Sequence, residues 1–308
     1  MNTYLKYQSP AIQFFAFLAF AGGFFLLNAL LTFLFFHDIN ELLANPTVVI
    51  SQEAITKFKV VQIISAIISF LFPALLFGYY SSPKALPYIG IQKTISPIVL
   101  IPAIVLLFVI QPFIGYIGNL NEHINFGEFQ KNMLKMEAMY DRIMKVFLQM
   151  HSFGDLLFNL FIMALLPAVS EELFFRGAFQ KALLRLSNRP WIAIFISSTV
   201  FALLHGTLLK VIPIFTLGLL LGTIYHVTRN IWYTIIIHFI NNCLALLAYY
   251  YGDRSEFLKK LSDDNIQVPV YMAIVSVAIS VGLIYFIAKK GEEVLPKTMT
   301  DEDNDFIA

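Results

Sequence analysis

Runs of about 20 apolar residues recur along this chain, and they constrain its fold more than any other feature. A membrane-spanning helix needs about 20 such residues, because the hydrocarbon core of a bilayer is about 30 Å thick. Of the 308 residues, 58% are hydrophobic and 13% are charged, whereas a soluble domain carries about 25% charged residues. Helices satisfy their own backbone polar groups in lipid. We therefore expect an all-α, polytopic transmembrane helix bundle embedded in the lipid bilayer.

The apolar runs predict about eight spans, with seven as the alternative. The fifth and sixth runs are short and closely joined, so they could be half-buried or re-entrant. Prolines within or beside the runs are expected to kink or end spans. The eight runs are residues 12–36, 58–80, 98–117, 156–184, 191–205, 211–226, 232–251 and 268–288.

The longest polar connection lies before the fourth span and has an amphipathic pattern. Apolar residues recur there at steps of three and four with charged residues between them, which predicts an amphipathic helix of about seven turns. It either packs on the bundle or on lipid headgroups, or acts as a lid over a site. The apolar positions are Phe126, Phe129, Met133, Met136, Tyr140, Ile143, Phe147 and Met150.

These patterns divide the chain into four parts. The N-terminal three transmembrane spans occupy 1–120, the amphipathic extramembrane connection 121–155, a transmembrane core 156–251, and the last span with an acidic tail 252–308. Lys and Arg residues gather in cytoplasmic loops of membrane proteins. Their distribution favours a multi-pass protein with both termini cytoplasmic, in the plasma membrane if the source is a prokaryote. The net charge of +1 gives no indication of a nucleic-acid partner.

Charged residues interrupt the fourth apolar run, and such residues are costly inside a membrane unless they line a wet cavity or meet a partner. On a helix, Glu172 and Arg176 are four residues apart and share a face, while Glu171 points about 100° away. One glutamate can thus be held by the arginine while the other faces a different environment. The alternative is that the segment has reached the interface, where all three charges meet headgroups.

Two further polar groups interrupt later runs. His205 closes the fifth run in Phe201-Ala-Leu-Leu-His205, and His238 and Asn242 lie four residues apart within the seventh. Each could be a satisfied core or interfacial residue, or a bond between helices. Together with the glutamates, however, they provide a base to activate water and donors to hold an oxyanion.

The three motifs in this order resemble the CPBP family, which groups type II CAAX prenyl endopeptidases with bacterial Abi and bacteriocin-immunity-associated proteins. The resemblance covers residues 156–251 and implies an intramembrane endopeptidase. It implies that Glu171 activates water with help from His205, that His238 and Asn242 hold the oxyanion, and that Glu172 and Arg176 support the site. The implied partner is a membrane-associated protein or peptide substrate, which in the family includes lipidated CAAX proteins.

A metal is the open question about this site, because family names often include the word metalloprotease. Glu171, His205 and His238 could supply carboxylate and imidazole ligands to zinc. The signature His-Glu-x-x-His is missing from the sequence, and the one cysteine, Cys243, excludes a cysteine-based zinc site. We therefore favour a glutamate-activated water without a cofactor.

Two functions from other classes remain as alternatives. A non-catalytic immunity or scaffold protein of the same family would use the polar site to bind a partner. A proton-coupled carrier would use membrane Glu and His residues as a proton relay. The sequence shows no internal repeat of the kind from which many carriers are built, and this favours the hydrolase.

Overall fold

The computed structural model describes residues 4–35, 51–92, 94–124, 127, 129–148, 150, 152–207, 210–252 and 268–294. Every regular element in these ranges is helical, as the apolar pattern predicts. The elements are η1 (Tyr4–Tyr7), α1 (Pro10–Phe35), α3 (Gln52–Ser65), η2 (Ala66–Leu71), α4 (Phe72–Ser81), α5 (Ala85–Tyr88), α6 (Pro97–Val109), α7 (Gln111–Glu122), α8 (Phe129–Phe147), α9 (Phe153–Leu160), η3 (Phe161–Leu165), α10 (Leu166–Glu172), η4 (Leu173–Gln180), α11 (Lys181–Ser187), α12 (Pro190–Leu204), α13 (Val211–Thr228), α14 (Ile231–Gly252) and α16 (Val270–Val294).

Seven helical segments in the described ranges are long and apolar enough to cross a membrane. They match seven of the eight expected runs, and the eighth, Pro190–Leu204, is a shorter apolar helix. With 15 residues, α12 is about 22 Å long at 1.5 Å per residue, which is less than the roughly 30 Å of a hydrocarbon core. The expectation of eight full spans is therefore corrected to seven and a short helix.

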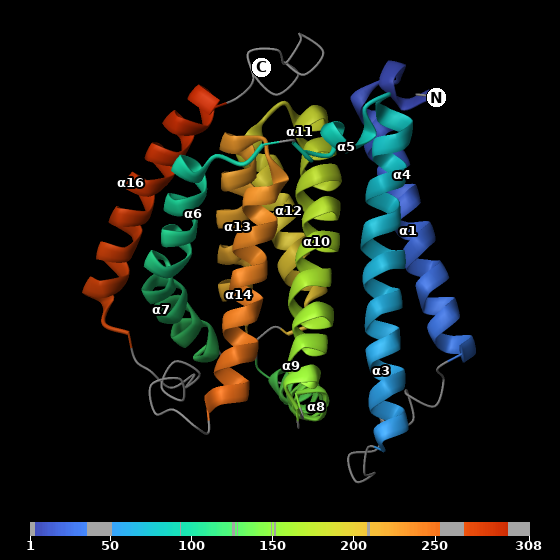
Figure 1. Cartoon of the computed structure of the whole chain (residues 1–308), viewed down its shortest axis with the longest axis vertical. Helices are drawn as coiled ribbons and strands as arrows, with labels where there is room; N and C mark the ends of the chain where they lie inside the picture. Colours follow the sequence, from blue (N-terminus) through green and yellow to red (C-terminus); the bar gives the residue numbers. More distant parts are fainter. Residues whose placement is uncertain are drawn as a thin grey trace.

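The spans form three groups side by side (Figure 1). α10, α12, α13 and α14 occupy the centre, α1 with α3 and α4 lies on one side, and α6, α7 and α16 lie on the other. A phenylalanine-rich apolar cluster joins the centre to α1 and α4, and a second cluster joins it to α6 and α16. α14 contributes Ile235 to the first cluster and Ile237 to the second. The next residue, His238, therefore lies where the two clusters meet.

Three stretches inside the spans are π-helical, with a wider turn than an α-helix: Ala66–Leu71, Phe161–Leu165 and Leu173–Gln180. The first two are followed by Pro73 and Pro167 in the first turn of the next segment. Proline lacks an N–H, and its ring clashes with the carbonyl four residues earlier, so an extra residue in that turn lets the helix continue. The prolines thus do not end these spans. The third stretch carries Arg176, and π-turns are frequent at functional sites.

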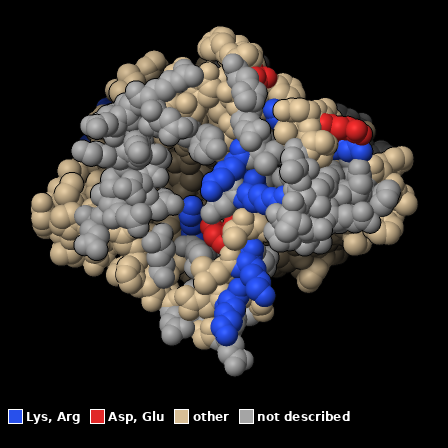
Figure 2. Space-filling view, turned by 90° about the horizontal axis from the view of Figure 1, so that it is seen from below, with Lys and Arg blue, Asp and Glu red and all other residues tan. Residues whose placement is uncertain are grey.

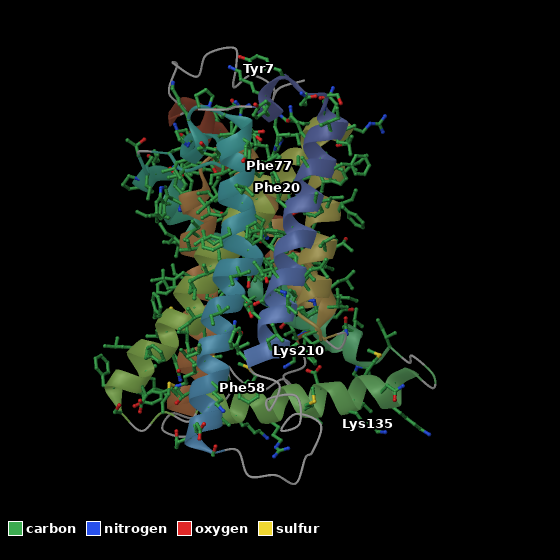
Figure 3. All side chains as sticks on the ribbon, turned by 90° about the vertical axis from the view of Figure 1, so that its right-hand side faces the viewer. Tyr7, Phe20, Phe58, Phe77, Lys135 and Lys210 are labelled. Carbon is green, nitrogen blue, oxygen red and sulfur yellow. The ribbon has the colours of Figure 1, made fainter. Side chains whose placement is uncertain are left out.

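The amphipathic helix forms, but it is shorter than predicted. α8 has 19 residues, or about five turns, from Phe129 to Phe147. The predicted end position Met150 lies outside it, and Phe126 lies outside the described residues. Of the predicted apolar positions, Met133 is 4% exposed. α8 lies across one end of the bundle, crossing the direction of the spans (Figure 3). Met133 therefore packs on the bundle.

The two ends of the chain's membrane part lie at the same end of the bundle, on opposite sides of it. α1 begins and α16 ends at the same end of the bundle, and α8 lies at the other (Figure 1). Figure 3 labels Lys135 and Lys210 at the α8 end and Tyr7 at the opposite end. Lys6 precedes Tyr7 in η1, so basic residues occur at both ends, and the cytoplasmic placement of the termini stays a prediction.

Candidate active site

The glutamate pair lies inside one helical segment that runs without a break from Phe153 to Ser187. The Arg176 Nη1 group donates to Glu172 Oε1 at 2.8 Å, as the spacing of four predicts. The two side chains are 1% and 0% exposed. The alternative that the charges meet lipid headgroups at the interface is therefore wrong for this pair. A buried ion pair needs further polar partners to offset its desolvation. Arg176 Nη2 has one in the Gly218 carbonyl at 3.3 Å.

His238 provides a second partner for the same carboxylate. Its Nδ1 lies 2.9 Å from Glu172 Oε1. A buried carboxylate held by an arginine accepts hydrogen bonds, so Nδ1 carries the proton of this contact. The other ring nitrogen, Nε2, is then turned away from Glu172 and lies 4.0 Å from Glu171 Oε2. Glu172 therefore fixes the ring orientation of His238 and aims Nε2 towards Glu171.

Glu171 has a different environment from its neighbour, as the 100° offset predicts. Its side chain is 18% exposed, whereas that of Glu172 is fully buried. Its Oε2 atom has no hydrogen-bond partner among the described residues; the same is true of Glu172 Oε2, but only Glu171 has exposed surface through which a water can reach it. A buried carboxylate oxygen without a partner is costly and marks a position where a water or a substrate group can bind. Glu171 is thus the carboxylate of the pair that remains available for chemistry.

His205 joins the site through Phe201, one turn earlier on α12. His205 Nδ1 lies 2.8 Å from the Phe201 carbonyl oxygen. A carbonyl only accepts, so Nδ1 carries a proton and the neutral ring presents Nε2 as an acceptor. The buried Phe201 ring makes edge contacts with the rings of both His205 and His238, at centroid distances of 4.6 and 5.8 Å. The Arg176 guanidinium lies 4.6 Å from the same ring. Phe201 therefore packs against three polar groups of the site.

Asn242 lies one turn after His238 on α14 and is half-buried. Within the described part of the chain, the structure records no hydrogen bond between its amide and the other predicted site residues. The structure thus brings together Glu171, Glu172, Arg176 and His238 through direct contacts or short distances, and adds His205 through Phe201. The position of Asn242 is consistent with the same face of α14, but its participation stays a prediction.

Two residues that the sequence reading left out of the site also support it. The Gly218 and Gly222 carbonyls on α13 accept from Arg176 Nη2 and from Gln180 Nε2, at 3.3 and 3.0 Å. Gln180 follows Arg176 by four residues, as Gly222 follows Gly218, so the two bonds repeat at one-turn intervals. A Cβ on Gly218 would lie 3.0 Å from Ser198 Cβ on α12. The glycines therefore allow α13 to approach its neighbouring helices closely, and their carbonyls accept hydrogen bonds from the helix that carries the glutamate pair.

A contact from α8 reaches the loop that follows His205. The Thr207 hydroxyl donates to Glu137 Oε2 at 2.7 Å. Thr207 is buried, and Gly206 before it has a φ of +72°, a backbone conformation that favours glycine. No motif marks Glu137 in the sequence, because its partner lies 70 residues away. The amphipathic helix is therefore bonded to the chain two residues from His205.

The donor set of the site does not fit a metal. Among the described residues, no group of three or more His, Cys, Asp or Glu side chains is arranged to hold an ion. The Nδ1 atoms of His205 and His238 are engaged by a backbone carbonyl and by Glu172. These bonds still leave Nε2 of each ring able to bind a metal, but the two rings and Glu171 form no three-ligand set among the described residues. We therefore assign no step to a metal.

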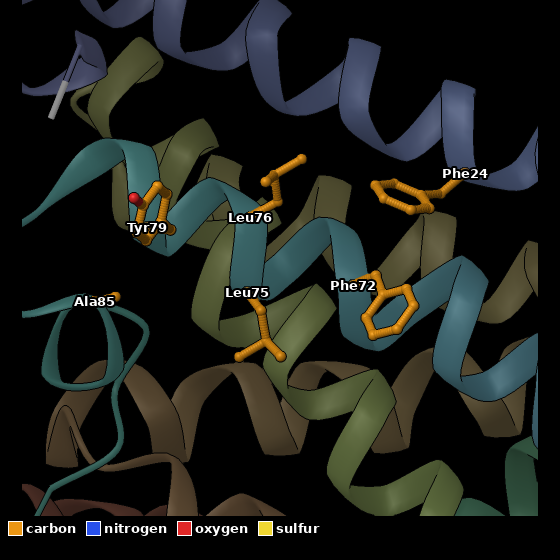
Figure 4. A pocket seen from close by; sticks show the side chains of 6 residues that line it. All are labelled: Phe24, Phe72, Leu75, Leu76, Tyr79 and Ala85. Atoms are coloured by element: carbon orange, nitrogen blue, oxygen red, sulfur yellow. The ribbon is translucent and has the colours of Figure 1, made fainter. Parts of the chain in front are cut away.

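An apolar groove of about 370 Å³ lies elsewhere, between α1 and α4 (Figure 4). None of the predicted site residues lines it. Its walls are Phe24, Phe72, Leu75, Leu76, Tyr79 and Ala85.

Comparison with known proteins supports a family for the central part of the chain. Residues 153–244 match the family model described as type II CAAX prenyl endopeptidase Rce1-like. No curated protein and no solved structure gave a significant match. The matched segment contains the glutamate pair, both histidines and Asn242. Over residues 153–244, this chain is therefore similar to the type II CAAX prenyl endopeptidases.

Proposed function

We propose that this protein is an intramembrane endopeptidase that hydrolyses a peptide bond of a membrane-associated protein, with Glu171 as the general base. The observation that carries the proposal is the division of labour between adjacent glutamates. Glu172 is fully buried and its Oε1 is bonded to both Arg176 and His238, whereas the side chain of Glu171 is 18% exposed. A base must reach a water molecule, and Glu171 is the one that can.

Glu171 would take a proton from water while the oxygen of that water attacks the carbonyl carbon of the scissile bond. The C–O bond forms, the carbonyl oxygen becomes an oxyanion, and the tetrahedral intermediate then expels the amine. The proton held by Glu171 goes to the leaving nitrogen as the C–N bond breaks. His205 assists at the first step, because its Nε2 is the free acceptor of the ring.

The oxyanion would be held by His238 and by the Asn242 amide. Since Nδ1 of His238 is bonded to Glu172, donation to an oxyanion must come from Nε2, which requires the protonated ring. Glu172 supplies the negative partner for that form. Donors that are already aimed at the developing charge need no reorganisation during the reaction, and this is the main advantage of such a site.

The substrate class follows from the surroundings and from the family. The site lies within a bundle of seven candidate spans, so a peptide bond must be brought to it within or beside the membrane. The family match adds a lipidated, CAAX-like protein as the first substrate to try.

The test is the purified protein in liposomes with a membrane-anchored peptide. Glu171→Gln should lower kcat by about 100- to 10,000-fold, because it removes the base and preserves size. Its thermal unfolding should match that of the wild type, since Glu171 makes no bond on which the helix depends. The chelator EDTA should leave the wild-type rate unchanged. Full activity in Glu171→Gln would refute the mechanism. If the protein only binds a partner, the wild type would cleave nothing, and Glu171→Gln would still bind that partner.

A further inference from the structure

A stripe of basic residues runs along α8 on the side opposite its buried residue. Lys131, Lys135, Arg142 and Lys145 fall within a sector of about 80° when each residue is turned by 100°. Met133, which is 4% exposed, lies on the other side of the helix. The three lysines are exposed, and Arg142 is half-buried. We name these four residues the basic stripe; it faces away from the bundle.

The basic stripe lies at the end of the bundle at which His205 and its loop lie. α8 is bonded through Glu137 to Thr207, two residues after His205. Seen from this end, Lys and Arg side chains gather in a band over the middle of the molecule, beside a hollow (Figure 2). Lys210, in the same connection as Thr207, is exposed at this end as well (Figure 3). Basic side chains thus gather on the end of the bundle at which His205 and its loop lie.

We propose that the basic stripe binds an acidic segment of the polypeptide substrate on the aqueous side of the scissile bond. This inference rests on the proposed endopeptidase function and adds a substrate class to it. The stripe covers 14 residue steps, or about 21 Å at 1.5 Å per residue. An extended chain advances by about 3.3 Å per residue, so about six substrate residues would lie along the stripe.

The direction of the stripe favours a polypeptide over lipid headgroups. Helices that bind anionic lipid present basic residues beside an apolar face that enters the bilayer. Here Met133, on the side of α8 opposite the stripe, is buried, and Lys135 of the stripe lies on the side of α8 away from the spans (Figure 3). Exposed ion pairs are individually weak and are screened by salt. The stripe should therefore act on substrate binding, and its effect should disappear at high ionic strength.

The experiment compares two membrane-anchored peptides in phosphatidylcholine liposomes. They differ only in a six-residue segment outside the membrane, which is Asp/Glu in one and Asn/Gln in the other. The wild type should show a KM about tenfold lower for the acidic peptide, which equals about 1.4 kcal/mol, at an unchanged kcat. Lys131→Gln with Lys135→Gln and Lys145→Gln should abolish this preference. Replacement of the same lysines by Arg should retain it.

A matched control uses three exposed basic residues from elsewhere in the chain, Lys84→Gln with Arg189→Gln and Lys289→Gln, and it should behave as the wild type. Equal KM values for the two peptides in the wild type would overturn the proposal. The proposal would also be overturned if the triple Lys→Gln variant cleaved both peptides more slowly than the wild type, and did so only in liposomes that contain phosphatidylglycerol. The stripe would then bind lipid headgroups.

Failure of the stripe and failure of the enzyme can be distinguished. If the wild type cleaves neither peptide, the proposed function fails, and binding of the free acidic hexapeptide to the intact protein still tests the stripe by fluorescence anisotropy. Weaker binding by the triple Lys→Gln variant, with the control triple unchanged, supports the stripe. Unchanged binding in both triples overturns it.

Discussion

Glu172 Oε1 accepts from two residues at once, Arg176 on its own helix at 2.8 Å and His238 on α14 at 2.9 Å. The contact between Glu172 and His238 is the link between the ion pair and the proposed chemistry. It fixes which ring nitrogen of His238 carries the proton and which one faces Glu171. A carboxylate in this position orients a histidine and provides a negative charge beside it.

The first prediction separates the orienting effect of Glu172 from its charge. In Glu172→Gln the amide oxygen can still accept from Arg176 and His238, but the negative charge is lost. We expect kcat to fall by about 100-fold, comparable with the loss of one oxyanion donor, while KM changes little. Steady-state cleavage of the anchored peptide measures both values.

Ser170→Ala is the control for that change, because Ser170 is buried on the same helix and donates only to carbonyls of its own segment at Leu166 and Pro167. Its kcat should stay near the wild-type value. A Glu172→Gln enzyme with normal kcat would show that the charge has no part in the reaction.

A second prediction concerns the stability of the ion pair. Arg176→Met leaves the Glu172 carboxylate buried with His238 as its remaining partner, and breaking a buried pair costs about 3 to 5 kcal/mol. The double variant Glu172→Met with Arg176→Met removes both charges and should be more stable than Arg176→Met alone. Thermal unfolding in detergent compares the variants. If the double variant is no more stable than the single one, the uncompensated charge is not the cause.

Local spacing explains what could be predicted of this site. The Glu172 and Arg176 pair and the separate environment of Glu171 follow from the 3.6-residue turn, and the structure confirms both. The contact between His238 and Glu172 joins residues 66 positions apart. It depends on how α14 packs against α10, which no local pattern encodes. The three motifs indicated that these residues lie in one site, but they did not indicate which side chains form hydrogen bonds with each other.

Backbone partners were beyond prediction for a different reason. Gly218 and Gly222 have the spacing of small residues that lets membrane helices pack closely, and their carbonyls accept from Arg176 and Gln180. Every residue has a carbonyl, so no residue type identifies the acceptor. In the same way, a proline predicts a disturbed turn but not its form, and the π-turn before Pro167 required the structure.

The third prediction tests the close approach of α13 and α12. In Gly218→Ala the new Cβ would lie 3.0 Å from Ser198 Cβ and 3.2 Å from Ser198 Cα, so the backbone of α12 has to move. Overpacking costs about 1 to 3 kcal/mol, which exceeds the gain of about 1 kcal/mol in helix propensity. We expect lower stability, and lower activity because the Gly218 carbonyl shifts away from Arg176.

Gly282→Ala is the matched control for Gly218→Ala. Gly282 also lies within a helix, α16, but its Cβ would meet no atom within 4 Å. That variant should gain stability of about 1 kcal/mol from helix propensity alone. The midpoint of thermal unfolding should therefore move in opposite directions for the two alanines, and a shift in the same direction would contradict the packing argument.

The last prediction concerns the bond that holds α8 next to the site. Thr207→Val keeps the shape of the side chain but removes the hydroxyl that donates to Glu137 at 2.7 Å. A hydrogen bond to a charged group contributes about 1.5 to 3 kcal/mol, so opening of α8 should become at least about tenfold more frequent. Hydrogen exchange followed by mass spectrometry should show faster exchange in α8 and an unchanged rate in α16. Thr207→Ser retains the donor and should exchange as the wild type does. Equal exchange of α8 in the valine and serine variants would mean that its other contacts with the bundle hold it, and that the position of His205 does not depend on Glu137.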